Sequence, residues 1–90
     1  MIAVEPLSEN EWLVTIQSGS TTKHRVRVTP EDLRRFGGEG VSVQQLLEAS
    51  FRFLLERESN TSILSSFDLP VIGRYFPEYS KEIRRYLGNE

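Results

Sequence analysis

The spacing of apolar residues changes once along this chain, from a period of two to a helical period. Trp12, Val14 and Ile16 stand at alternate positions, as a half-buried strand requires. From Val43 onward, apolar residues recur three and four positions apart, as on one face of a helix. Strands therefore come first and helices follow. This order predicts an α+β fold, in which a small antiparallel sheet packs on three or four helices.

The first part of the chain predicts an antiparallel β-hairpin. One strand is expected over 12–17 and the returning strand over 24–28. Residues 2–5 can add a third, shorter strand, which Pro6 would end. Gly19 lies between the two main strands, where its freedom to adopt a positive φ suits a turn.

The register of this hairpin must place apolar residues opposite one another on one face. Two registers do so, because Val26 can lie opposite either Val14 or Ile16. A two-residue turn would instead place Lys23 opposite Val14. We therefore expect a connecting loop of about three to five residues.

Capping signals mark the first two helices. Thr29, followed by a proline and two acids, is expected to cap a helix that ends near residue 36. Ser42 has capping-box spacing and should begin a helix that runs to about residue 58. The second helix is apolar over a broad stripe, so we expect it to be covered on more than one side.

Three further helical segments are expected in the last third of the chain. A brief helical turn is predicted over 61–67, and Asp68 is expected to cap a helix that reaches Phe76. Pro77 would open the last helix, which Gly88 would end. Because no strand–helix–strand unit appears in this order, a nucleotide-binding parallel sheet is not expected.

The chain has 90 residues, which is the size of one domain spanning 1–90. A chain this short buries only about 60–65% of its unfolded surface, so its core should be thin. The residues expected in that core are Trp12, Val14, Ile16, Val26, Val28, Leu33, Leu47, Leu54, Ile63, Ile72 and Ile83.

The segment 67–79, FDLPVIGRYFPEY, holds four of the nine aromatic residues of the chain. Aromatic side chains provide large contact areas, either inside a core or at an interface. Tyrosine and arginine are also enriched among the residues that contribute most to binding energy. The contact candidates for a protein partner are therefore Arg74, Tyr75, Phe76 and Tyr79, and the alternative is that these rings belong to the core.

A cluster of bases supports nucleic-acid binding as the alternative function. Lys23, Arg25 and Arg27 project from one face of the returning strand, and Arg34 and Arg35 follow in the next helix. Contacts with phosphates require such clusters. The net charge of −2, however, gives no overall attraction to nucleic acid.

No arrangement of residues typical of a catalytic, metal or cofactor site is present. His24 is the only histidine, and no second ligand stands at metal-binding spacing from it. The glycines at 37–40 lack the lysine of a phosphate-binding loop, and no serine has a nucleophile-elbow context. We therefore expect a protein that is not an enzyme and holds no cofactor.

Composition adds expectations about location. The chain has no cysteine, so disulfides and thiolate ligands are excluded. Its apolar runs are far shorter than the roughly 20 residues of a membrane span, and no signal peptide is visible. We expect a cytoplasmic protein without membrane contact.

The run FRFLLERESNTSILSSFDLPVIGRYFPEY, residues 51–79, resembles a stretch shared by small bacterial proteins of unknown function. The TKHRVRV strand and the strand that contains Trp12 fit the same resemblance. It implies a bacterial, cytoplasmic origin and no particular activity. The sequence therefore predicts a small non-enzymatic module for protein interaction or structure, whose partner is an unknown protein or a second copy of itself.

Overall fold

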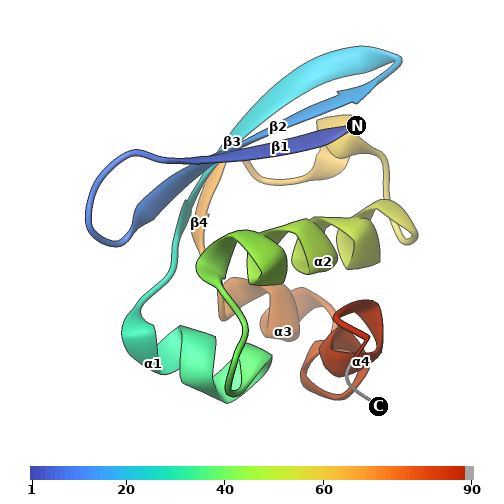
Figure 1. The fold of residues 1–90 in the computed structure, drawn as a ribbon. Helices are drawn as coiled ribbons and strands as arrows, with labels where there is room; N and C mark the ends of the chain where they lie inside the picture. The colour runs from blue at the N-terminus through green and yellow to red at the C-terminus, as the bar shows by residue number, and fades with distance from the viewer. Residues whose placement is uncertain (89–90) are drawn as a thin grey trace.

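A computed structural model describes residues 1–88 and has a four-stranded sheet with its helices on one side (Figure 1). The strands, in their order across the sheet, are β1 (Ile2–Pro6), β2 (Glu11–Ser18), β3 (Ser20–Arg27) and β4 (Ser66–Asp68). The helical elements are α1 (Pro30–Asp32), the π-helical turn η1 (Leu33–Gly37), α2 (Val43–Leu55), the 3-10 turn η2 (Asn60–Ser62), α3 (Val71–Tyr75) and α4 (Tyr79–Tyr86). The expected α+β fold class is confirmed.

The β2–β3 hairpin is tighter than expected. Ser18 lies opposite Ser20, so Gly19 alone forms the tip, with a φ of 79°. In this register Val14 lies opposite His24. The expected loop of three to five residues is wrong, and neither expected register is present. The reason is that Val26 lies opposite Trp12, an apolar pair that neither expected register contains, and the buried His24 ring fills the inward position opposite Val14.

The third strand is present as β1, which pairs with β2 in antiparallel orientation and places Ile2 opposite Ile16. A fourth strand was not expected. β4 pairs with β3 in parallel, and Phe67 lies beside Val26. The connection between these two strands passes through α1 and α2, so the chain does contain a strand–helix–strand crossover.

Two predictions about the segment before α3 are wrong. The helical turn expected over 61–67 reaches only Ser62, and the chain then becomes extended. Asp68 ends β4 and does not cap α3, whose N-cap is Pro70 without a side-chain hydrogen bond. Hydrogen bonds to β3 decide this conformation, because a sheet edge satisfies backbone groups that a short helix would leave unpaired.

The capping signals of the first two helices are confirmed. Thr29 Oγ1 accepts a hydrogen bond from the backbone N–H of Asp32 at 3.1 Å, and the Asp32 carboxylate accepts one from the N–H of Thr29 at 3.0 Å. Ser42 and Gln45 form the same reciprocal pair at the start of α2, at 3.1 and 2.9 Å. Each pair satisfies two N–H groups that a helix start leaves free.

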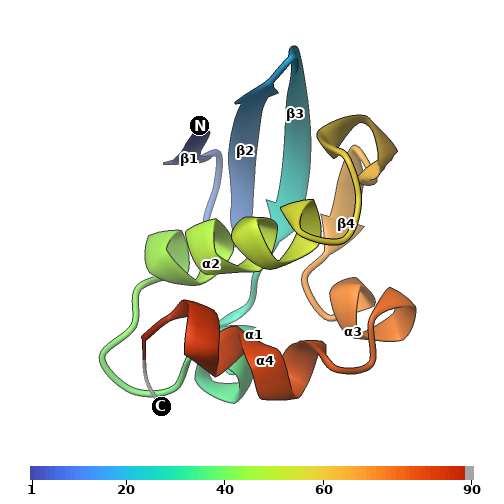
Figure 2. The same ribbon diagram turned by 90° about the vertical axis from the view of Figure 1, so that its right-hand side faces the viewer.

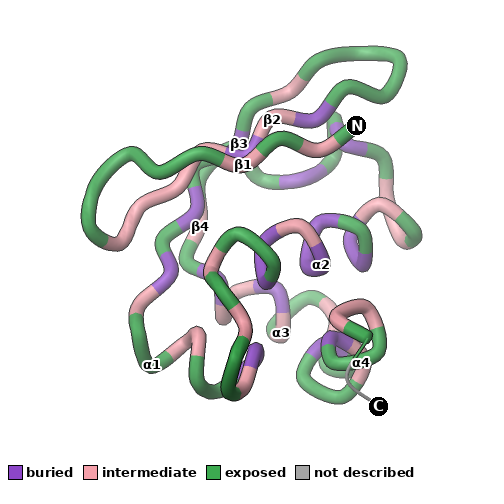
Figure 3. Tube along the Cα trace, viewed as in Figure 1, coloured by how far each residue is buried: buried purple, intermediate pink, exposed green. Residues whose placement is uncertain are grey.

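The core lies between the sheet and the helices, and α2 runs through its centre (Figure 3). Of the predicted core residues, Trp12 and Leu33 are only half-buried, and the other nine are buried. Because α2 faces the sheet on one side and α4 on the other, its broad apolar stripe is covered as expected. The apolar residues that the prediction omitted are Phe36, Leu46, Ala49, Phe51, Phe53, Leu69 and Tyr79.

Candidate functional site

Tyr79, one of the four contact candidates, is fully buried at the start of α4. Its hydroxyl lies 2.7 Å from Ser50 Oγ, and the Ser50 hydroxyl donates to the carbonyl of Leu46 at 2.7 Å. Tyr79 is therefore the donor in the pair with Ser50. Burial raises the pKa of the Tyr79 hydroxyl far above its ordinary value, so this group stays neutral and keeps its proton.

Aromatic neighbours surround the buried ring of Tyr79. Its centroid is 5.0 Å from that of Phe36 and 5.3 Å from that of Phe53. Phe53 also meets Phe76 and Tyr86 edge to face, at 6.0 and 5.7 Å. This cluster joins η1, α2 and α4. The hypothesis that Tyr79 contacts a partner is wrong, because the ring has no free surface.

Tyr75 lies on the surface, only four residues earlier, and is 65% exposed. It ends α3 and lines a shallow apolar groove together with Leu64, Phe67 and Val71. Leu64 is 45% exposed, although leucine is a residue that folding normally buries. The groove thus brings together two large apolar side chains that the fold leaves in water.

The volume of this groove is about 30 Å³. Sites for small molecules and cofactors usually enclose about 300–1,000 Å³. The groove also lacks a cluster of polar groups, because Glu58 is the only charged residue in its lining. A surface of this kind suits apolar contact with another protein surface.

The loop that carries Leu64 is held by a partly buried chain of hydrogen bonds. His24 Nδ1 lies 2.7 Å from the carbonyl oxygen of Leu64 and must donate, since a carbonyl only accepts. In the neutral ring, Nε2 then accepts from the hydroxyl of Thr22 at 2.9 Å. Asn60 donates to Thr22 Oγ1 at 3.1 Å and to the carbonyl of Ser20 at 3.0 Å. Nδ1 of His24 thus fastens this loop to β3, while Nε2 bonds to Thr22 within the same strand.

Arg74 and Phe76, the other contact candidates, lie on either side of Tyr75. Arg74 is exposed and lines a second, polar depression together with Arg27 and Asp68. Phe76 is half-buried and lines the apolar groove. The structure therefore brings two of the four candidates, Tyr75 and Phe76, to the apolar groove and leaves Arg74 in the neighbouring depression. Leu64 was missed, because nothing in its local sequence distinguishes an exposed leucine from a buried one.

The bases of β3 lie on the face of the sheet that no helix covers. Lys23, Arg25 and Arg27 are all exposed there. Arg27, however, lies between Glu11 on β2 and Asp68 on β4. With Glu5 on β1, this open face carries three acids and three bases, so its net charge is zero.

The two remaining bases of the nucleic-acid hypothesis lie outside the sheet. Arg34 and Arg35 are exposed on η1, and the guanidinium of Arg35 lies 4.9 Å from the ring centroid of Phe36. The structure therefore does not join them to the basic residues of β3 in a single row along one element. Phosphate contacts along a nucleic acid need a more continuous positive surface.

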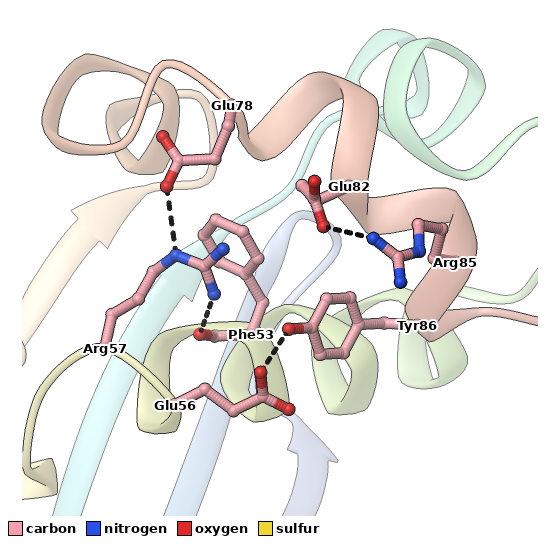
Figure 4. Close-up of polar contacts among 7 residues, drawn as sticks. All are labelled: Phe53, Glu56, Arg57, Glu78, Glu82, Arg85 and Tyr86. Atoms are coloured by element: carbon pink, nitrogen blue, oxygen red, sulfur yellow. Dashed lines mark hydrogen bonds and ion pairs between the residues drawn. The ribbon is translucent and has the colours of Figure 1, made fainter.

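Polar contacts also join the end of α2 to α4 at the surface (Figure 4). Arg57 donates to the carboxylate of Glu78 at 3.0 Å and to the carbonyl of Phe53 at 3.1 Å, and its guanidinium lies 3.7 Å from the Phe53 ring centroid. Tyr86 donates to Glu56 at 2.6 Å. These contacts fix α4 against α2, which gives them a structural role.

Residues 1–88 hold neither a grouping of metal ligands nor a membrane-spanning helix. Within that range, no three His, Asp or Glu side chains are grouped closely enough to hold a metal ion. Nor does any helix in the described part of the chain have the length and apolar composition to cross a bilayer.

Comparisons with protein-family models, curated proteins and solved structures gave no match for this chain. The resemblance to small bacterial proteins therefore stays a prediction.

Proposed function

We propose that this chain is a non-enzymatic protein-interaction module that binds its partner at the groove between Leu64 and Tyr75. One observation carries the proposal. Four large apolar side chains are exposed among the described residues, and two of them, Leu64 and Tyr75, line the same groove. Isolated exposed apolar residues are common, but a pair that shares one groove is typical of a contact surface.

The composition of this surface also supports the proposal. Tyrosine is a rigid side chain that adds contact area at low entropic cost, and it is frequent among residues that dominate binding energy. Arg74, exposed and adjacent to Tyr75 in α3, would add a charged contact from the neighbouring polar depression. By contrast, the balanced charge of the open sheet face does not favour nucleic acid, so binding through Lys23, Arg25 and Arg27 is the weaker alternative.

The test is a quantitative affinity purification from the source cell with three variants of the tagged protein. Leu64→Ala and Tyr75→Ala should each lose most of the captured partner. Leu7→Ala is the matched control, because Leu7 is 43% exposed on the loop between β1 and β2, away from the groove. It should capture the partner as well as the unchanged protein does.

Equal capture by all three variants would contradict the proposal. So would partner loss that is accompanied by unfolding, which circular dichroism of each variant would detect. A bacterial, cytoplasmic setting remains part of this proposal and rests on the sequence alone.

A further inference from the structure

We propose that the partner at this groove is a second copy of the same chain, bound by antiparallel pairing of the two β4 strands. This inference rests on the proposed function, because the pairing would cover the groove described above. Three features of β4 support it: the backbone groups at the edge of the sheet, the side chains beside them, and the charges that the pairing would bring together.

β4 is an outer strand of the sheet (Figure 2). Its free edge carries backbone groups that have no hydrogen-bond partner among the described residues. Arg25 N–H bonds to the carbonyl of Ser65 at 2.8 Å, and Leu69 N–H bonds to the carbonyl of Arg27 at 3.0 Å. Residues 65, 67 and 69 therefore point their peptide groups toward β3. By alternation, the N–H and C=O groups of Ser66 and Asp68 point away from β3, and within residues 1–88 no other strand pairs with them.

These four groups are self-complementary about a twofold axis. If Phe67 lies opposite Phe67 of the second copy, Ser66 of each chain lies opposite Asp68 of the other. Both residues present their peptide groups at the edge, so each such pair exchanges two hydrogen bonds and the pairing makes four. The two sheets would then join into one continuous sheet of eight strands.

The same register would place apolar side chains together beneath the joined sheets. Phe67 pairs with Val26 and therefore faces the helix side, where the groove lies. Opposite residues that are not hydrogen-bonded have their side chains closest, so the two Phe67 rings would meet at the axis. Leu64 and Tyr75 lie beside Phe67 in each copy, and the pairing would bring these exposed groups toward the apolar surface of the second copy.

The charged residues of β3 and β4 on the outer face of the two joined sheets are compatible with this register. Asp68 lies beside Arg27 of its own chain and would lie opposite the uncharged Ser66 of the second copy. On the far side of that Ser66, on β3 of the second copy, lies Arg25. No like charges lie directly opposite each other, a placement that would weaken strand pairing. If the two β4 strands were parallel instead, Ser66 and Asp68 of the two copies would not form these reciprocal hydrogen-bonded pairs.

The other edge of the sheet is less suited to pairing. Met1 exchanges hydrogen bonds with Gln17 at 3.0 and 3.1 Å. The peptide N–H and C=O groups of the odd-numbered residues of β1 therefore point toward β2, and those of the even-numbered residues point outward. One of these outward residues is Pro6, which has no N–H to donate. β1 thus carries a protective feature that β4 lacks.

The first experiment measures oligomeric state by sedimentation equilibrium from about 10 µM to about 1 mM, the range in which small interfaces associate. The unchanged protein should form dimers with rising concentration. Ser66→Pro removes an N–H that points away from β3, so the fold should persist while two of the four intermolecular hydrogen bonds disappear. We expect its dissociation constant to rise about tenfold or more. Ser66→Ala keeps the N–H and is the matched control.

The second experiment tests the register, using the absence of native cysteine. Residues opposite each other in a hydrogen-bonded pair have Cα atoms about 5.5 Å apart, within reach of a disulfide. A mixture of Ser66→Cys and Asp68→Cys proteins should therefore form disulfide-linked heterodimers under mild oxidation. Either variant alone should cross-link much less, because equivalent positions lie about 7–8 Å apart on the diagonal. Both side chains lie on the outer face, so neither change disturbs the core.

A protein that stays monomeric up to 1 mM would overturn this inference, and so would dimers that Ser66→Pro leaves intact or that cross-link without the mixed pair. The proposed function can survive that result, because a different partner captured in a manner dependent on Tyr75 would still identify the groove as a contact surface. Failure of both the capture and the dimerisation experiments would remove both proposals.

Discussion

Tyr75 and Tyr79 are the same residue type, four positions apart in one aromatic segment, and they differ completely in burial. Tyr79 has no exposed surface, whereas 65% of Tyr75 is exposed. Residues four apart on one helix share a face, and this rule would have grouped the two rings. They lie instead on different helices, because α3 ends at Tyr75 and α4 begins at Tyr79. A break of three residues separates a ring that stabilises the core from one that is free to bind.

The largest expected effect would test this contrast directly. Tyr79→Ala removes a ring that packs against Phe36 and Phe53, and we expect it to lower the free energy of unfolding by about 3–5 kcal/mol. Tyr75→Ala should change the same quantity by less than about 0.5 kcal/mol. Urea unfolding of dilute protein at 25 °C measures both.

Similar losses for the two alanine variants would break the contrast and place Tyr75 in the core. Tyr79→Phe refines the comparison, since it keeps the ring and removes only the hydroxyl that donates to Ser50. We expect this variant to lose about 0.5–1.5 kcal/mol, the usual contribution of a single hydrogen bond.

An intermediate effect is expected at His24, the buried histidine that holds the loop of Leu64 beside the exposed Tyr75. His24→Leu keeps an apolar side chain at this position but leaves the carbonyl of Leu64 and the hydroxyl of Thr22 without their ring partner. We expect a loss of about 1–3 kcal/mol in the free energy of unfolding. Faster amide hydrogen exchange in residues 63–66 should accompany it.

Lys23→Ala is the control for this variant, because Lys23 is adjacent in β3 but exposed on the opposite face. An unchanged stability of His24→Leu would show that the hydrogen bonds of the ring are not needed to hold the Leu64 loop.

The smallest effect is expected at Glu78, the last residue of the break between the two tyrosines. Its pKa is lowered below the ordinary 4.5, first by a hydrogen bond with its own backbone and next by the Arg57 guanidinium. A lowered folded-state pKa gives stability that is present above pH 4.5 and is lost as the pH falls through the folded-state value. Glu78→Gln should therefore lower the melting temperature at pH 7, and only slightly, because this ion pair is partly exposed to solvent. At low pH the substitution should have no effect, because the carboxyl group of Glu78 is then protonated and the ion pair is already lost.

A thermal scan of Glu78→Gln at both pH values, with the distant Glu9→Gln as control, measures this difference. A melting temperature difference that persists at low pH would exclude the ion pair as its cause.

Local signals accounted for a large part of the fold. Alternation predicted the strands around Val14, and capping pairs at Thr29 and Ser42 predicted two helix starts. These features depend on contacts between residues a few positions apart, which a sequence pattern records directly. The tip at Gly19 was recognised as a turn, but its length was not, because pairing rules for apolar residues did not allow for a buried histidine.

The candidate site was predicted only in part. Residue type identified Arg74, Tyr75 and Phe76 as contact candidates, yet it gave Tyr79 the same role. Leu64 entered the site only through the loop that His24 holds, across 40 positions of sequence. No local pattern contains such a contact, because the crossover that pairs β4 with β3 is what places the two residues side by side.

The amino-acid sequence by itself determined the order of strands and helices, the caps, and the concentration of aromatic rings near the C-terminal end. Only the tertiary structure decided that Ser66–Asp68 would be an edge strand, that Tyr79 would be buried and that Tyr75 would remain in water. The physical reason is the range of the interactions. Caps and periodicity arise within one or two turns of chain, whereas strand pairing and ring burial depend on which distant surfaces meet.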